Sequence, residues 1–375
     1  MYLFFYIYLI VSFLFLSLYY NEKLSRKVYI CLITGILAFC TAFRNLAVGN
    51  DTYAYYNSFM SSLEKKSDDF FSMIKAVFFM SSTNQNKDPG FLIFEKFLYN
   101  FSFGSFEFYQ LIVGLLVLIP IGYIIYKYVV DFSSYIISYA FYISLFYHFL
   151  PNSATRQTIA LSFYFLASII WLKKEKMFFP ILLLIIGALI HKSVLICILP
   201  FLLMKIRNKR YIVSVTIILS LYFMINGTSI ALWMGELVKS DVYTAYAESG
   251  FYEGSSKPFG FIIQMYVYFL LSLLRVFRLD ELKKEYQWCY VNFCIATVLC
   301  PLILVNPSLI RLSSYFSIWG ILFLPMIIQN SSFNSKYRLI VYWMLLFLTL
   351  GRPLLNSNDN YRFKWQYMEL HERYS

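Results

Sequence analysis

Long apolar segments follow one another along almost the whole chain, with short polar stretches between them. A helix that crosses a bilayer needs about 20 mostly apolar residues. Of the 375 residues, 60% are hydrophobic and only 14% are charged, whereas a soluble domain carries about 45–50% apolar and about 25% charged residues. This excess of apolar residues cannot fit inside one water-soluble core. The sequence therefore predicts an all-α polytopic membrane protein.

The predicted membrane spans are 3–20, 28–43, 107–126, 134–150, 156–172, 211–227, 259–277, 288–305, 310–329 and 337–351. Residues 177–204 are also apolar, but His191 and Lys192 interrupt them, so they form either one tilted span or two short helices. Residues 91–102 are too short and too polar to cross, and we expect a re-entrant or interfacial helix there.

These segments predict about 10–12 transmembrane helices in all, with additional re-entrant or interfacial helices. We expect a single transmembrane domain over residues 1–351 and a short polar C-terminal tail over 352–375.

Lysine and arginine gather in short loops between the apolar segments, at 21–27, 173–176, 205–210, 278–284 and 336–338. Such loops face the cytoplasm in membrane proteins. The larger loops 44–106 and 228–258 then lie on the outer side, as does the turn at His191 and Lys192. The net charge of +12 is explained by these loops. Because the basic residues form no stripe on a helix face, we expect no binding of nucleic acid.

Two groups of polar residues begin helices at the outer side. The first runs from Arg44 to Tyr56, and its Asp51 is placed to cap a helix after a turn. The second runs from Asn152 to Gln157 and places Arg156 at a helix N-terminus, where free N–H groups and a guanidinium favour phosphate. The alternative is that both arginines are interfacial anchors whose side chains reach the headgroups.

Two further groups lie at the same depth. His191 interrupts an apolar stretch, and an ionisable residue inside a membrane segment is a candidate functional residue; the alternative is a polar turn between short helices. Arg311 opens a span, with Tyr315 one turn later on the same face; the alternative is again an interfacial anchor. Several basic centres at one depth indicate a polyanionic partner near the outer leaflet, such as a lipid-linked diphosphate.

Several stretches together resemble the EpsG family of Wzy-like bacterial polysaccharide polymerases. They are Arg44 to Phe59, Asp88-Pro89-Gly90-Phe91, Asn152 to Ala160, His191-Lys192-Ser193 and Arg311 to Phe316, in the order of the family, and the hydropathy resemblance extends over about residues 1–350. The resemblance implies a fold similar to class C membrane glycosyltransferases. It also implies an enzyme of the bacterial inner (cytoplasmic) membrane whose active site faces the periplasm or exterior.

The implied reaction joins oligosaccharide repeat units carried on undecaprenyl or another polyprenyl diphosphate into O-antigen, capsule or exopolysaccharide. As a hypothesis, Arg156, Arg311 and Arg44 bind the diphosphate, and either His191 or Asp51 is the base. We expect the sugar contacts to come from Tyr53, Tyr56, Asn152, Gln157 and Tyr315.

Direct displacement would invert the anomeric centre, and the sequence shows no motif for a metal, a nucleotide or another cofactor. The alternative functions are a flippase or transporter of the same lipid-linked glycan and a glycan ligase. Besides the glycan lipid and the bilayer, a chain-length regulator and a flippase are candidate partners.

Overall fold

The computed structural model describes residues 8, 11–12, 14–15, 18, 25–65, 88–206, 208–238, 259–273, 283–329, 337, 340–345, 347, 349 and 361–370. Within these residues the secondary structure is helical, apart from one isolated antiparallel bridge between Arg44 and Phe363. The predicted all-α class is confirmed. The predicted span 3–20 lies mostly outside the described residues, and the loop segments 66–87 and 239–258 and the tail at 352–360 and 371–375 lie wholly outside them. Of the predicted span 337–351, the structure describes 337, 340–345, 347 and 349, which are helical.

The chain forms two compact units. The first holds the described residues up to Val194 and those from Trp343 onward, and the second holds those from Leu195 to Tyr342. The first unit contains α2 (Arg26–Ala42), α3 (Thr52–Met60), η1 (Ser62–Glu64), α5 (Pro89–Phe101), α6 (Phe106–Tyr128), α7 (Phe132–Tyr142), η2 (Ile143–Tyr147), α8 (Leu150–Ser153), α9 (Thr155–Lys174) and α10 (Phe178–Ile190).

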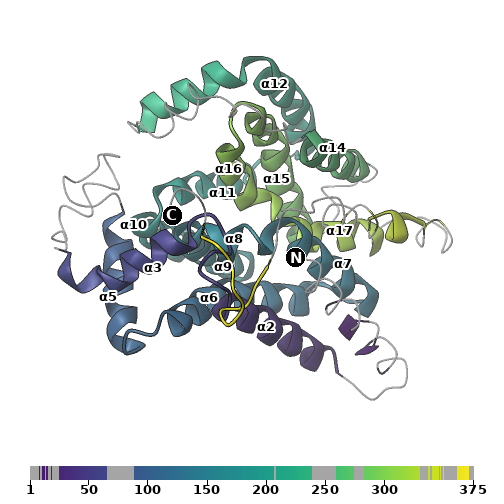
Figure 1. Cartoon of the computed structure of the whole chain (residues 1–375). Helices are drawn as coiled ribbons and strands as arrows, with labels where there is room; N and C mark the ends of the chain where they lie inside the picture. Colours follow the sequence, from purple (N-terminus) through teal and green to yellow (C-terminus); the bar gives the residue numbers. More distant parts are fainter. Residues whose placement is uncertain are drawn as a thin grey trace. The chain divides into compact units, whose positions relative to one another are not determined.

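Two helix pairs form the frame of the first unit: α2 packs along α6, and α9 packs along α10 (Figure 1). Local signals explain where these helices begin and end. The Ser105 side chain caps α6 by accepting from the Phe108 backbone N–H at 3.3 Å. Helix α9 ends where Glu175 takes a left-handed conformation, with φ of 58°.

The second unit contains α11 (Ile198–Leu203), α12 (Arg210–Val238), α14 (Phe259–Leu273), α15 (Lys284–Leu299), η5 (Cys300–Leu304), η6 (Pro307–Leu309), α16 (Ile310–Ser317) and α17 (Gly320–Gln329). Helix α15 is central here, packed by α12, α14, α16 and α17. The fully buried rings of Trp288 and Trp319 meet edge to face at 5.8 Å between centroids. This unit is therefore held by large apolar side chains.

The helices follow most of the predicted spans, with two informative breaks. The apolar stretch 177–204 is interrupted where α10 ends at His191 and the 3-10 helix η3 (Lys192–Cys197) begins. This agrees with the alternative of two short helices. The predicted span 310–329 is split into α16 and α17, which meet at a bend of 54°.

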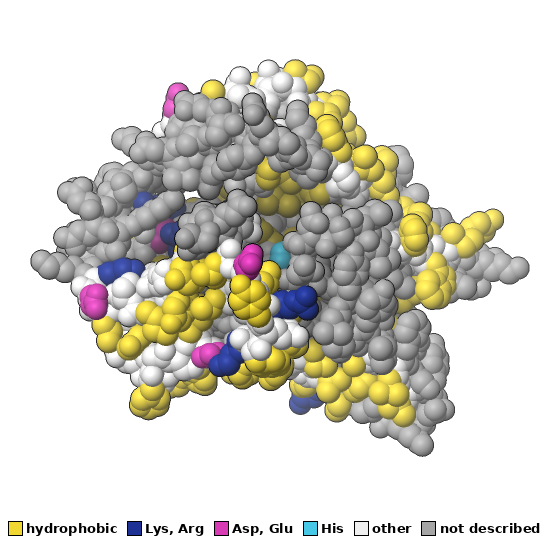
Figure 2. All heavy atoms as spheres, viewed as in Figure 1, with side chains coloured by type: hydrophobic (Ala, Val, Ile, Leu, Met, Phe, Trp, Pro, Cys, Tyr) yellow, Lys and Arg dark blue, Asp and Glu magenta, His cyan; other side chains and the backbone are white. Residues whose placement is uncertain are grey.

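Three described helices are long and apolar enough to cross a membrane: Phe106–Tyr128, Tyr211–Met234 and Lys284–Leu304. The bent pair adds a fourth if it forms one span, and Phe178–Ile190, Lys192–Leu203 and Phe259–Leu273 are shorter apolar helices. Large apolar side chains are exposed on many of the helices, as the yellow surface in Figure 2 shows. Ile218 and Ile225 of α12, for example, are 65% and 82% exposed. Such a surface is suited to lipid rather than water.

Candidate functional site

The loop between α2 and α3 is fixed by a close approach to α8. Gly49 has φ of +88°, and a Cβ added there would lie 2.0 Å from the Asn152 carbonyl oxygen. The Thr52 hydroxyl lies 2.7 Å from the same oxygen and 2.5 Å from the Val48 carbonyl oxygen, to either of which it donates. Only glycine fits at position 49. Its close contact with Asn152 brings the polar residues from Arg44 to Tyr56 next to those from Asn152 to Gln157.

Arg44 is buried beneath this loop. One terminal nitrogen donates to the Thr41 carbonyl oxygen at 2.8 Å, and Nε donates to the Thr52 hydroxyl at 3.4 Å. The other terminal nitrogen lies 3.3 Å from the Gln110 side-chain oxygen when that amide is oriented to donate to Ala42. Burial lowers the pKa of Arg44 to about 10. Its partners among the described residues are neutral oxygens, so its charge is solvated but not neutralised.

A second close approach joins the start of α5 to the end of α10. A Cβ added to Gly90 would lie 2.7 Å from the Leu189 Cβ and 2.8 Å from its carbonyl oxygen. Pro89 occupies the first helical turn, where its missing N–H does no harm. The short Asp88-Pro89-Gly90 sequence thereby places the Asp88 carboxylate beside His191, the residue that ends α10.

Asp88 is the centre of the candidate site. Its Oδ2 accepts a hydrogen bond from Arg156 at 2.5 Å and lies 3.9 Å from His191 Nδ1. The Asp88 side chain is 4% exposed, whereas Arg156 is 29% and His191 18% exposed. The carboxylate is thus the hidden member of the group, and both basic side chains keep part of their surface open.

Aromatic rings complete the surroundings of Arg156. Its guanidinium lies 5.9 Å from the centre of the Phe91 ring, within the range of a cation–π contact. Tyr55 of α3 also interacts with Arg156 through its hydroxyl, and its ring meets that of Phe91 edge to face at 5.8 Å. The guanidinium is therefore held in place by a carboxylate and by aromatic side chains from two helices.

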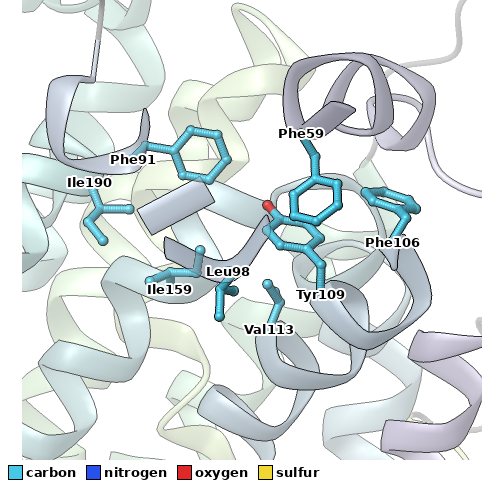
Figure 3. Close-up of a cluster of buried hydrophobic side chains, with 8 residues drawn as sticks. All are labelled: Phe59, Phe91, Leu98, Phe106, Tyr109, Val113, Ile159 and Ile190. Atoms are coloured by element: carbon cyan, nitrogen blue, oxygen red, sulfur yellow. The ribbon is translucent and has the colours of Figure 1, made fainter. Parts of the chain in front are cut away.

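A single apolar cluster holds the five helices that carry these residues. Figure 3 shows its members: Phe59 of α3, Phe91 and Leu98 of α5, Phe106, Tyr109 and Val113 of α6, Ile159 of α9, and Ile190 of α10. Arg156 lies within about one helical turn of Ile159, and His191 directly follows Ile190. Tight packing of this cluster fixes the positions of the site residues above it.

Glu95 is a buried carboxyl on α5 that sequence reasoning did not single out. It is 1% exposed, and its Oε2 accepts from the Ser58 hydroxyl of α3 at 2.8 Å. Burial raises the pKa of Glu95 to about 7, and the nearby charges of Lys65 and Arg156 offset part of that effect. It adds a titratable group to the neighbourhood of Arg156.

The other predicted residues of the first unit take varied positions. Asp51 precedes α3 as expected, but its side chain makes no capping hydrogen bond. Tyr53 and Tyr56 stack on each other at 6.2 Å. Asn152 and Gln157 are buried, at 1% and 2% exposure. These residues surround the Arg44 loop and the start of α9.

Arg311 and Tyr315 belong to the second unit, on α16. Tyr315 is fully buried, and Arg311 is partly buried at the start of the helix. The structure therefore brings together Arg156 and His191 with Asp88 in the first unit, while the predicted diphosphate contact from Arg311 remains a prediction.

Asp88, Tyr55 and Glu95 had no assigned role in the sequence analysis. A usable signal existed for Asp88, since Asp-Pro-Gly between an outer loop and a short helix indicates a fixed turn with a charged side chain. For Tyr55 the signal was the spacing of four residues from Asp51, which places it on the helix face next to the cap.

Comparison with family models gives one result that covers most of the chain. Residues 27–367 match the model of the EpsG family. The matched range includes Arg44, Asp88, Arg156, His191 and Arg311. Searches of curated proteins and of solved structures gave no match. Since the family model spans nearly the whole sequence, this chain belongs to the EpsG family.

Proposed function

We propose that this protein is a membrane glycosyltransferase that polymerises oligosaccharide repeat units carried on a polyprenyl diphosphate. Membership of the EpsG family supports a role in polysaccharide biosynthesis. The observation that carries the more specific proposal is the grouping of Arg156, Asp88 and His191, which offers an anion-binding guanidinium and an imidazole backed by a carboxylate.

The distribution of charge in the first unit supports an outward-facing site. Arg26 at the start of α2 donates to the Val130 carbonyl oxygen beyond the end of α6, so these two helices run antiparallel. Lys127 lies in the last turn of α6, and Lys173 and Lys174 lie in the last turn of α9. These basic residues occupy the helix ends opposite to those of Arg156 and His191. By the positive-inside rule, the basic ends face the cytoplasm and the candidate site faces the periplasm or exterior.

The proposed reaction is a displacement at the anomeric carbon. His191 takes the proton of an acceptor hydroxyl, the hydroxyl oxygen forms a bond to the anomeric carbon, and the bond from that carbon to the diphosphate oxygen breaks. The electron pair leaves with the diphosphate, and the configuration inverts. Asp88 near Nδ1 stabilises the imidazolium that forms and leaves Nε2 to face the acceptor.

The leaving diphosphate needs compensation of its charge. Arg156 can supply it because its guanidinium is partly exposed and is already oriented by Asp88. Fixed cations in a site with little water act on charge that develops in the transition state. Arg311 and Arg44 are the further candidates from the sequence, and Asp51 is the alternative base. Tyr55, beside Arg156, joins Tyr53 and Tyr56 as a candidate for stacking on sugars.

The test is extension of a synthetic polyprenyl-diphosphate repeat unit by the purified protein, resolved on a gel without added nucleotide. We expect a ladder from the wild type and none from well-folded Arg156→Ala or His191→Ala. Lys173→Ala at the opposite end of α9 is the matched control and should keep the ladder.

Absence of a ladder with the organism's own repeat unit would contradict the polymerase. Transfer to a different acceptor would then identify a ligase, and movement of the lipid across vesicles would identify a flippase.

A further inference from the structure

The C-terminal segment Tyr361–Gln366 returns to the candidate site. The backbone N–H of Lys364 donates to the Phe43 carbonyl oxygen, and the N–H of Asn45 donates to the Arg362 carbonyl oxygen, both at 2.9 Å. The Asn45 side chain also donates to the Gln366 carbonyl oxygen at 2.7 Å. The segment is thus paired with the loop on both sides of Arg44.

Side chains attach the same segment to the ends of two helices. The Tyr361 hydroxyl donates to the Cys40 carbonyl oxygen near the end of α2 at 2.5 Å, and Lys364 pairs with Glu107 in the first turn of α6 at 2.5 Å. The Phe363 ring stacks on Trp365, with 4.6 Å between centroids and 5° between planes. These contacts give the segment one definite position.

Tyr361 also lies close to Arg44: burial raises the pKa of the Tyr361 hydroxyl, and the positive charge of Arg44 offsets part of that rise. Arg44 is 4% exposed, and its backbone is paired with that of the C-terminal segment through the antiparallel bridge to Phe363. Because the long arginine side chain loses several rotamers when it is fixed, a covering segment would hold it in the one conformation that its neutral partners allow.

We propose that Tyr361–Gln366 is a strap that lies on the same side of the membrane as the candidate site and positions Arg44 for a substrate diphosphate. The statement that the strap positions Arg44 rests on the proposed function. The statement about the side of the membrane on which the strap lies does not. Residues 361–366 attach to the outer end of α2 and the outer end of α6, which are the ends opposite Arg26 and Lys127. The C-terminal segment therefore shares the side of Arg156 and His191.

Sidedness and contact are tested without any activity measurement. In spheroplasts, Gln366→Cys should react with a membrane-impermeant maleimide, and Lys176→Cys, in the loop between α9 and α10, should react only after lysis. The double variant Asn45→Cys with Gln366→Cys should be joined by a short bismaleimide, seen by mass spectrometry of the digest. Labelling of Gln366→Cys and Lys176→Cys from the same side of the membrane, or a failure of the pair to cross-link, would overturn the strap.

Positioning is tested by truncation before Tyr361, with removal of only residues 371–375 as the matched control. Loss of a positioned charge-assisted contact should raise the KM for the lipid-linked substrate by about tenfold and change kcat less, whereas partial unfolding would lower kcat alone. In an Arg44→Met background the truncation should have little further effect on KM, because the strap acts through Arg44. Equal effects of truncation in both backgrounds would overturn the positioning role. If no variant, including the wild type, extends the substrate, the proposed function fails while the labelling result stands.

Discussion

Arg156 and Arg44 lie in the same unit and were predicted to share one role, yet their surroundings differ. Arg156 is paired with a buried carboxylate and keeps 29% of its side chain exposed. Arg44 is 4% exposed and is held by neutral oxygens. The two arginines are thus held in different ways for the one proposed role, Arg156 by a buried carboxylate and Arg44 by neutral oxygens and the paired C-terminal segment. Arg156 is suited to direct contact, and Arg44 needs its covering segment to be positioned.

The largest effect is expected from Arg156→Met. Removing a cation that acts on a developing charge lowers the rate by about 10²–10³. The substitution also removes the guanidinium that pairs with the buried Asp88 carboxylate, so the thermal midpoint of unfolding should fall. Adding Asp88→Asn should restore much of the midpoint but none of the extension activity. A double variant as unstable as the single one would show that the pair is not coupled in this way.

Gly90 and Gly49 each lie against neighbouring backbone. Substituting one or the other disturbs the surroundings of Arg156 and of Arg44 separately. Gly90→Ala must push α5 away from Leu189 and should weaken extension by separating Asp88 from His191. Gly49→Ala must disrupt the loop over Arg44, because its φ of +88° and the nearby Asn152 carbonyl both exclude a side chain. Extension assays and thermal unfolding would be compared with Gly35→Ala, where an added Cβ meets nothing within 4 Å. Wild-type behaviour of Gly90→Ala would contradict the geometry at Asp88.

A smaller effect on stability is expected from Arg44→Met. This substitution removes a desolvated cation and leaves no carboxylate unpaired among the described residues, so the thermal midpoint should change less than for Arg156→Met. Replacement of buried ions by apolar side chains is often neutral. A larger loss of stability at Arg44 than at Arg156 would reverse the comparison.

The smallest effect concerns Glu95 and pH. Because burial raises its pKa from 4.5 to about 7, the folded protein holds a proton that the unfolded chain has released at pH 5 to 7. Stability contributed by this group should therefore decrease as pH rises through that window and level off above it. Glu95→Gln should flatten this dependence in detergent, as followed by thermal unfolding. An unchanged pH dependence would mean that Glu95 is ionised in the folded state throughout.

The sequence was sufficient for most of the described helices, whereas the side of the membrane on which the candidate residues gather stays a prediction. Apolar runs and basic loops are local signals, and an ionisable residue such as His191 stands out inside an apolar segment. The break at His191 and the helix after Asp51 were predicted from the same kind of local pattern.

The partners of these residues were not predictable, because they depend on tertiary packing. Asp88 is 68 positions from Arg156, and only the packing of Gly90 on Leu189 brings it to His191. The exact phase of α3 decides that Tyr55 meets Arg156 while Tyr53 stacks on Tyr56. The return of Tyr361 to α2 spans 321 positions and has no local signal.

In the proposed mechanism, His191, with Asp88 beside it, removes the acceptor proton while Arg156 holds the diphosphate. The most direct test of this mechanism is the pH dependence of kcat/KM for extension, measured for the wild type and for well-folded His191→Gln. We expect the wild-type rate to fall on the acidic side as the general base is protonated, and His191→Gln to lack this limb and to be slower by about 10²–10⁴. An equal rate and an unchanged acidic limb in His191→Gln would contradict it.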